Sequence, residues 1–238
     1  MKLDILVLTA HPDDAEMSCG GTLMKAVDAG LKVGIVDLTR GEMGSRGTPE
    51  LRKEEAAKAS EIMGVHARDN LGYRDGFFTN DETHQRGIIQ QIRRFQPEVI
   101  ITNAPKDRHP DHGKAAALVR DAAWYSGLRK LETDWDGAKQ VHWRPKKVMH
   151  IIQDHELQPD VVVDISDYYE KRLTAIKAYG SQFFNPQHKE EQTYISTERF
   201  WRFLEARARN MGHLIGATFG EGFIVDQAVK INTPMDLV

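Results

Sequence analysis

The 238-residue sequence lacks several features that would place it in particular protein classes. Cys19 is its one cysteine, so an intrachain disulfide and an all-cysteine zinc site are both excluded. It has no run of 18 apolar residues, as a transmembrane helix requires, and its first residues do not have the pattern of a signal peptide. Lys and Arg number 32 against 35 Asp and Glu, so the basic excess of a nucleic-acid binder is missing. We therefore expect a cytoplasmic protein that binds neither membranes nor nucleic acid.

The sequence alternates between apolar runs of strand length and helical segments. Strands are expected at Leu3–Thr9, Lys32–Thr39, Arg68–Leu71, Glu98–Asn103, Lys147–Gln153, Val161–Ile165 and Glu221–Val225. Helices are expected at Gly20–Ala29, Pro49–Met63, Asp81–Phe95, His112–Ser126, Asp167–Tyr179 and Thr197–Met211. This alternation predicts a single Rossmann-like α/β domain over residues 1–238, with a mostly parallel sheet, helices on both faces and a more helical C-terminal part.

Two clusters of His and Asp follow the first and fourth expected strands, at Ala10–Asp14 and Asp107–His112. Ligands of open α/β sheets bind beyond the carboxyl ends of the strands, so we expect both clusters at one edge of the sheet. His11, Asp14 and His112 would then form a set of two histidines and one carboxylate. A catalytic zinc site uses three such ligands and keeps a position open for water. The same set also suits iron(II).

Asp13 lies beside this set without a role in metal binding. A carboxylate there can take a proton from a water that the metal activates, and can later pass it to a leaving amine. His109, as an imidazolium on the other side of the substrate, could stabilise an oxyanion or act as an acid. The structural alternative is that the paired aspartates cap a helix and the histidines pack in the core. Two such clusters after parallel strands favour the metal site.

The two clusters resemble the paired motifs of the PIG-L/LmbE-like N-acetylglucosamine deacetylases, in which A-H-P-D-D follows the first strand and H-P-D-H follows a later one. The resemblance implies a zinc-dependent N-deacetylase that hydrolyses an amide bond. It implies the metal ligands His11, Asp14 and His112. It further implies that Asp13 is the general base and His109 the electrostatic or acid partner.

Within this family the sequence is most similar to the bacillithiol-pathway branch, the N-acetylglucosaminyl-L-malate deacetylases. The matching segments are Val36–Thr39, Gly47–Ala56, Asp107–His112, Ser181–Phe183 and Glu221–Phe223. The resemblance implies a small sugar substrate that carries malate, and a homo-oligomer of three or six subunits. Deacetylation of another N-acetylglucosamine conjugate remains an alternative.

Three further residues are candidates for the site. The resemblance suggests that Asp111 orients a histidine ligand. Arg52 lies in a helix of mixed charge, where a solvent-exposed position is the default. The resemblance nevertheless implicates it in substrate binding. The two nitrogens of its planar guanidinium suit a malate carboxylate. Arg108 could bind substrate, hold Asp13 or Asp14 in place, or form a structural ion pair.

The sequence departs from the branch at a tyrosine that often precedes the Ala206–Arg207 segment. The matching position holds Phe200 or Trp201, and Tyr194 lies further upstream. The aromatic helix there is interpreted as core or as a subunit contact rather than as a surface that stacks on substrate. Gly41–Gly47, with three glycines, is expected to be a mobile loop that could serve as a lid, and Phe183–Gln192 a second, polar loop.

Two functions from other classes were considered. A nucleotide-binding oxidoreductase would need G-x-G-x-x-G after the first strand, but the only nearby glycines are Gly20 and Gly21. A sugar-binding protein without catalysis would not need Asp13, because binding alone requires no spare base. Both features favour the hydrolase.

Overall fold

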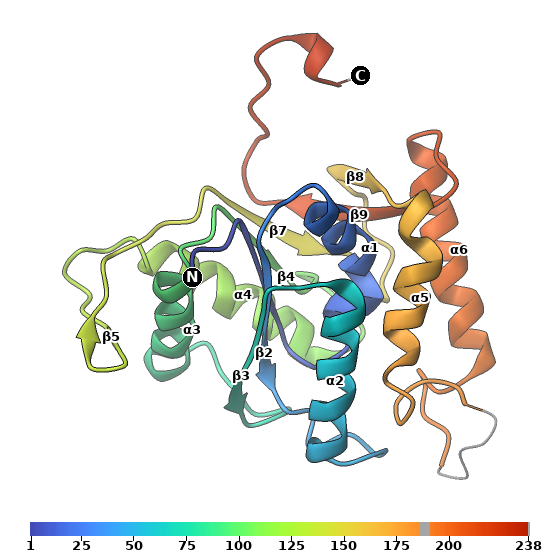
Figure 1. The fold of residues 1–238 in the computed structure, drawn as a ribbon, viewed down its shortest axis with the longest axis horizontal. Helices are drawn as coiled ribbons and strands as arrows, with labels where there is room; N and C mark the ends of the chain where they lie inside the picture. Colours follow the sequence, from blue (N-terminus) through green and yellow to red (C-terminus); the bar gives the residue numbers. More distant parts are fainter. Residues whose placement is uncertain (186–190, 238) are drawn as a thin grey trace.

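The computed structural model describes residues 1–185 and 191–237 of the chain, which fold around one seven-stranded sheet (Figure 1). The strand order is β3-β2-β1-β4-β7-β9-β8. The strands are β1 (Ile5–Thr9), β2 (Val33–Thr39), β3 (Ala67–Tyr73), β4 (Val99–Thr102), β7 (Lys147–Ile151), β8 (Val161–Asp164) and β9 (Gly220–Val225). The first five strands in this order run parallel, and β9 is antiparallel to both β7 and β8. The predicted Rossmann-like, mostly parallel sheet is confirmed.

Helices cover both faces of this sheet, as predicted (Figure 1). They are α1 (Asp14–Asp28), α2 (Pro49–Met63), α3 (Glu82–Phe95), α4 (Pro110–Tyr125), α5 (Tyr169–Lys177) and α6 (Glu198–Leu214). Side chains alternate between the two faces of a strand, so Leu6 and Leu8 of β1 pack with α3 and α4, whereas Val7 packs with α1 and α5. Among the described residues, we find no helix with both the length and the apolar character needed to cross a membrane.

The start of α1 differs from the prediction, because this helix begins at Asp14 and not at Gly20. Two adjacent glycines are typical of a turn, yet Gly20 and Gly21 lie inside the helix. A Cβ atom on Gly21 would lie 2.9 Å from the side chain of Ile165. The glycine therefore allows α1 to pack closely against the chain that follows β8, and this contact outweighs its low helix propensity.

Local capping explains the bounds of α2 and the start of α4. Thr48 caps α2 by accepting a hydrogen bond from the Leu51 amide, and Gly64 ends the helix with a φ of 73°, so the predicted bounds of α2 are correct. In contrast, α4 begins at Pro110, two residues earlier than predicted, because His109 is its N-cap.

Several short elements were not predicted. They are the hairpin of β5 (Asp134–Trp135) and β6 (Ala138–Lys139) and the 3-10 helices η1 (Ser166–Tyr168) and η2 (Pro234–Leu237). Short elements carry too few residues for a hydrophobic period to be detected. Of the expected polar loop over residues 183–192, residues 186–190 lie outside the described part of the chain.

The close packing of Gly21 gives a test of the fold. We expect Gly21→Val to lower the free energy of unfolding by about 2 kcal/mol, since the new side chain overlaps Ile165. This corresponds to a melting temperature roughly 4–8 °C lower in a thermal scan. Gly180→Val is the matched control, because nothing lies within 4 Å of a Cβ atom built there. Equal melting temperatures for the two variants would contradict this account of α1.

Candidate metal and acid–base site

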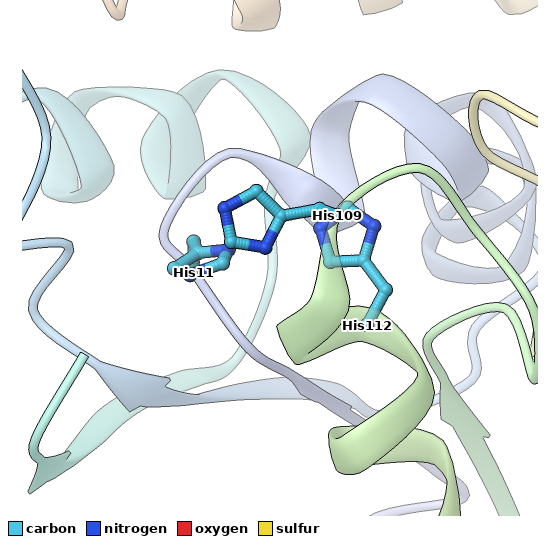
Figure 2. A group of neighbouring side chains, drawn as sticks. All are labelled: His11, His109 and His112. Atoms are coloured by element: carbon cyan, nitrogen blue, oxygen red, sulfur yellow. The ribbon is translucent and has the colours of Figure 1, made fainter. Parts of the chain in front are cut away.

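The polar residues that follow the parallel strands meet at the carboxyl edge of the sheet. His11 comes from the loop after β1, and His109 and His112 lie at the start of α4, after β4 (Figure 2). Their ring centroids are 4.7 Å apart for His11 and His109, 5.1 Å for His109 and His112, and 5.7 Å for His11 and His112. The fold thus brings together the two His/Asp clusters, which are about a hundred residues apart in the sequence.

Asp14 lies between two of these imidazoles. Its Oδ2 is 3.6 Å from Nδ1 of His11, and its Oδ1 is 3.2 Å from Nε2 of His112. All three side chains are buried. Two imidazole nitrogens and a carboxylate therefore converge, which is the donor set that the sequence analysis assigned to a metal.

The opposite nitrogen of each imidazole is held by a second carboxylate. His11 Nε2 lies 3.0 Å from Oδ1 of Asp75, and His112 Nδ1 lies 2.6 Å from Oδ2 of Asp107. A carboxylate on one ring nitrogen fixes the tautomer and leaves the other nitrogen free to bind a metal. Both free nitrogens face Asp14. The sequence analysis gave Asp75 and Asp107 no role, although each is a polar residue that follows a strand.

Asp111, which is expected to orient a histidine, lies near His11. Its Oδ2 is 3.5 Å from Nε2 of His11, and Asp75 makes the shorter contact. Asp111 accepts hydrogen bonds from the Gly76 amide at 2.8 Å and from Nζ of Lys114 at 3.0 Å. It therefore ties the start of α4 to the loop after β3 and adds negative charge behind His11.

Two amide side chains position Asp14, and the sequence analysis missed both. Asn103 Nδ2 donates to Asp14 Oδ2 at 3.0 Å, and Gln153 Nε2 donates to Asp14 Oδ1 at 2.9 Å. Asn103 also accepts a hydrogen bond from the Ala10 amide at 2.8 Å, which connects β4 to the loop after β1. Asn103 and Gln153 follow β4 and β7. Their position after parallel strands is the one feature of the sequence that could have predicted their place in the site.

The carboxylates control the charge of both histidines. Burial lowers the pKa of His112, but Asp14 and Asp107 outweigh it and raise this pKa to about 9. The pKa of His11 is also raised, because hydrogen bonds to Asp111, Asp14 and Asp75 overcome burial. Burial would raise the pKa of Asp14, yet the charge of His112 holds it well below its ordinary value. Protons therefore neutralise this carboxylate cluster when no metal is bound.

Asp13 has an unusual backbone and an unusual pKa. Its φ of 109° lies in the left-handed region, which a non-glycine residue adopts only when its surroundings enforce it. Burial raises the pKa of its carboxyl to about 7, although Arg52 opposes this shift. A base that titrates near neutral pH is well matched to proton transfer there.

Arg52 contacts Asp13 rather than open solvent. Its Nη2 donates to Oδ2 of Asp13 at 2.7 Å and to the Pro12 carbonyl at 2.8 Å, and its Nη1 donates to the Gly41 carbonyl at 3.3 Å. The side chain is only 7% exposed, which contradicts the default of a solvated position. Because Nη1 and Nη2 of Arg52 both donate to groups of the protein, this geometry does not support bidentate binding of a substrate carboxylate.

His109 presents one ring nitrogen to the site. Its Nδ1 accepts the backbone N–H of Asp111 at 3.3 Å, which assigns the proton of the neutral ring to Nε2. Burial, together with the charges of His11 and His112, lowers the pKa of His109 below its ordinary value. This environment favours a neutral donor over the expected imidazolium.

Arg108 contacts Asp154 and Tyr194. Its Nε is 3.5 Å from Asp154, and its guanidinium lies 4.1 Å from the ring centroid of Tyr194. Tyr194 donates to Asp154 at 2.6 Å. The structure shows an ion pair of Arg108, and its role in substrate binding stays a prediction. Tyr194 thus lies near the site, whereas Phe200 is buried in the apolar core, as the interpretation of the aromatic helix predicted.

The loop Gly41–Gly47 is attached to the site by hydrogen bonds. The Met43 amide donates to Asp75 at 3.0 Å, and Glu42 accepts the Asp75 amide at 2.8 Å. The Arg46 carbonyl accepts from Gln182 at 2.7 Å. The loop therefore contacts the carboxylate that orients His11, and its action as a lid remains a prediction.

The donor atoms permit more than one three-residue metal site. Ligand atoms of His11, His109 and His112 lie within 4.8 Å of one another, as do those of His11, Asp75 and Asp111. The predicted set of His11, Asp14 and His112 is a third arrangement, in which different oxygens of Asp14 face the two rings while Asp75 and Asp107 keep their hydrogen bonds. Its nitrogen and oxygen donors fit Zn²⁺ and Fe²⁺ alike.

Fold and site together are those of a metal-dependent hydrolase, and the comparisons with known proteins agree. The PIG-L family, described as GlcNAc-PI de-N-acetylase, matches residues 6–123. Diacetylchitobiose deacetylase of Thermococcus kodakarensis is 30% identical over 233 residues, covering 92% of this chain and 81% of that protein. A Bacillus cereus protein named probable N-acetyl-alpha-D-glucosaminyl L-malate deacetylase 2 is 29% identical over 229 residues, covering 85% and 99%.

A solved structure of related sequence has the same fold. The conserved protein TT1542 from Thermus thermophilus superposes with a TM-score of 0.86 at 36% identity, and the match covers 98% of each chain. The chain therefore belongs to the PIG-L family and is an N-deacetylase, a hydrolase of amide bonds.

The raised histidine pKa values predict that protons compete with the metal. Histidine binds a metal only as the neutral ring, so zinc affinity of the metal-free protein should rise steeply from pH 6 to pH 8, with roughly two protons released per ion at pH 7. Calorimetry in buffers of different ionisation enthalpy counts these protons.

Two histidine variants provide the control. His112→Ala should lose zinc, whereas His109→Ala should retain it with similar affinity. If His109→Ala loses zinc instead, the ligand set is the one made of three histidines.

Proposed function

We propose that this enzyme removes the acetyl group from an N-acetylglucosamine conjugate and that N-acetylglucosaminyl-L-malate is its substrate. The observation that carries the reaction is the arrangement around Asp14: two imidazole nitrogens face it, and a carboxylate holds each opposite nitrogen. We also propose Zn²⁺ as the metal, with Fe²⁺ as the alternative in cells. His11, Asp14 and His112 would hold this ion.

Asp13 carries the proposed proton transfers, and His109 stabilises the charge that develops on the substrate. A divalent ion held by these residues would lower the pKa of a water and polarise the acetamide carbonyl. Asp13 takes the proton of the attacking water with the carboxylate oxygen that Arg52 does not hold. His109 donates a hydrogen bond from Nε2 to the carbonyl oxygen as negative charge develops on it, and keeps its proton. Asp13 then passes its proton to the amine that leaves, so one water is consumed and acetate and a free amine are formed.

Arg52 has a positioning role in this proposal. Its positive charge opposes the effect of burial and keeps the pKa of Asp13 from rising further. Its hydrogen bonds to the Pro12 and Gly41 carbonyls join the loop that carries Asp13 to the loop after β2. Arg108, half-exposed beside Tyr194, is the better placed of the two arginines for contact with the anionic end of the substrate.

The malate assignment rests on the matching sequence segments and on relatives with that name. Other relatives are named for diacetylchitobiose and for an inositol conjugate of N-acetylglucosamine. The sugar is common to all of these names, and the group attached to it is what differs. We further propose that the enzyme is a single domain, works in the cytoplasm and forms a homo-oligomer of three or six subunits.

The release of free amine by zinc-loaded protein tests the proposal. Compounds to compare are N-acetylglucosaminyl-L-malate, the inositol conjugate, N,N'-diacetylchitobiose and free N-acetylglucosamine. We expect the malate conjugate to give the highest kcat/KM, and a chelator to abolish turnover. Asp13→Asn should retain zinc and lose activity by at least about 100-fold, the range of a general base. Preference for another conjugate would overturn the malate assignment, and loss of zinc from Asp13→Asn would overturn the role of Asp13.

The pH–rate profile tests the role of Arg52. Because Arg52 lowers the pKa of Asp13, its removal in Arg52→Gln should raise that pKa further. The base works only when deprotonated, so the acidic limb of kcat/KM should move to higher pH, and activity lost at pH 7 should partly return at pH 9. Lys58→Gln, an exposed change on the same helix, should leave the profile unchanged. A pure rise in KM for Arg52→Gln, with the same profile, would instead indicate substrate binding.

A further inference from the structure

A cavity of about 550 Å³ lies between α2 and the strands β2 and β3. Its lining comes from the loop after β1, from the two strands and the residue that follows β2, and from one face of α2. No residue that we assign to the metal or to proton transfer lines it. Its volume is in the range of sites that bind a small organic molecule.

Several polar side chains of this lining are already engaged within the protein. Arg68 binds Asp37 with two hydrogen bonds of 2.9 Å, and Asp69 lies 2.7 Å from Nη1 of Arg94. Asn70 donates to a backbone carbonyl at 2.6 Å and accepts a backbone amide at 2.8 Å. The fold fixes these groups, so the main contacts of a ligand must come from other residues.

Arg40 and Lys53 are cations of the lining that are free to bind a ligand. Neither side chain makes a hydrogen bond or an ion pair with another residue in the described part of the chain. Arg40 follows β2, and its guanidinium lies beside Gly72, where a Cβ atom would be 3.4 Å from Nη2. Lys53 comes from α2, on the helix side of the cavity. An anionic group between strand and helix can therefore contact both cations.

The rest of the lining indicates what carries this anionic group. The apolar lining residues are small or lack an aromatic ring, namely Pro12, Pro49, Ala56 and Ala57. A nucleobase would therefore find no aromatic side chain on which to stack. Glu50, which also has no partner among the described residues, can accept hydrogen bonds from hydroxyl groups. A sugar with one oxyanion matches these features, because arginine binds an oxyanion with two hydrogen bonds and lysine binds it as a point charge.

The cavity adjoins the contacts that Arg52 makes on behalf of the general base. Arg52 donates to the carbonyls of Pro12 and Gly41. Pro12 lines the cavity itself, and so do Arg40 and Lys53, the chain neighbours of Gly41 and Arg52. A ligand held by Arg40 and Lys53 would thus connect the same segments that the Arg52 guanidinium connects.

We propose that this cavity binds a small sugar derivative that carries one phosphate or carboxylate group. Arg40 and Lys53 bind the oxyanion, and Glu50 accepts a hydrogen bond from a hydroxyl. The ligand is an activator, because it holds together the segments that Arg52 joins and so keeps Asp13 in position. The binding site does not depend on the proposed function, whereas the activation rests on it.

Calorimetry with the zinc-loaded protein tests the binding. The probes are glucose 6-phosphate and glucuronate, with uncharged glucose as their matched control. We expect at least one anion to bind with 1:1 stoichiometry and glucose to bind at least about tenfold more weakly, as for loss of a charged hydrogen bond. The tighter of the two anions identifies the preferred oxyanion.

Variants of the exposed cations test which residues bind the probe. Arg40→Gln and Lys53→Gln should each raise the dissociation constant by at least about tenfold. Both side chains are exposed, so the melting temperatures of the variants should stay close to that of wild type. Lys58→Gln, an exposed change on α2 outside the cavity lining, is the control and should bind as wild type does.

Amide chemical shifts in NMR spectra locate the bound probe. We expect changes at Lys53 and Asn70, which line the cavity, and not at Asn103 and Gln153, which hold Asp14. Changes confined to the last two residues would overturn the proposed site. So would a lack of binding by both anions, or wild-type dissociation constants in both cation variants.

Amine release tests the activation. At a saturating concentration of the tighter anion, kcat/KM should rise about fivefold in wild type and in Lys58→Gln, and stay unchanged in Arg40→Gln and Lys53→Gln. Binding without a change in rate would overturn the activation. A lack of turnover in every sample would contradict the proposed function, whereas calorimetry and chemical shifts would still decide the binding site.

Discussion

The site depends on one constraint: a buried carboxylate, Asp14, shared by two histidines from distant parts of the chain. Carboxylates also hold the outer nitrogens of both rings. This arrangement concentrates negative charge among buried side chains, and protons or a metal cation must balance it. The same contacts that orient the rings thus create the affinity for a cation, and they raise the histidine pKa values when no cation is bound.

Buried ion pairs beneath this site join the elements that carry it. Arg68 on β3 binds Asp37 on β2 with two hydrogen bonds of 2.9 Å and also contacts Glu16 on α1. Arg52 on α2 contacts Asp13 just before α1. Buried charge pairs contribute little net stability, but a misplaced partner is costly. We infer that these pairs fix the position of α1, on whose first turn the site depends, more than they stabilise the fold.

Much of the fold could be predicted because its main elements are long and strongly patterned. The strands that became β1, β2 and β4 are apolar runs buried on both faces, and α2 carries its own capping residues. The prediction was wrong at the start of α1, where tertiary packing against Ile165 requires a glycine that local propensity assigns to a turn. The two-residue strands of the hairpin were missed because they have no detectable period.

For the site, the sequence by itself determined which residue types follow the first and fourth strands, and the topology of parallel strands then predicts that they meet. Only the tertiary structure decided what surrounds them. It placed Asp75, Asn103, Asp107 and Gln153 around the histidines and Asp14, and it turned Arg52 towards Asp13. Sequence motifs record neighbours along the chain, whereas these contacts join loops after four different strands. Their distances, their burial and the resulting pKa values exist only once the sheet has formed.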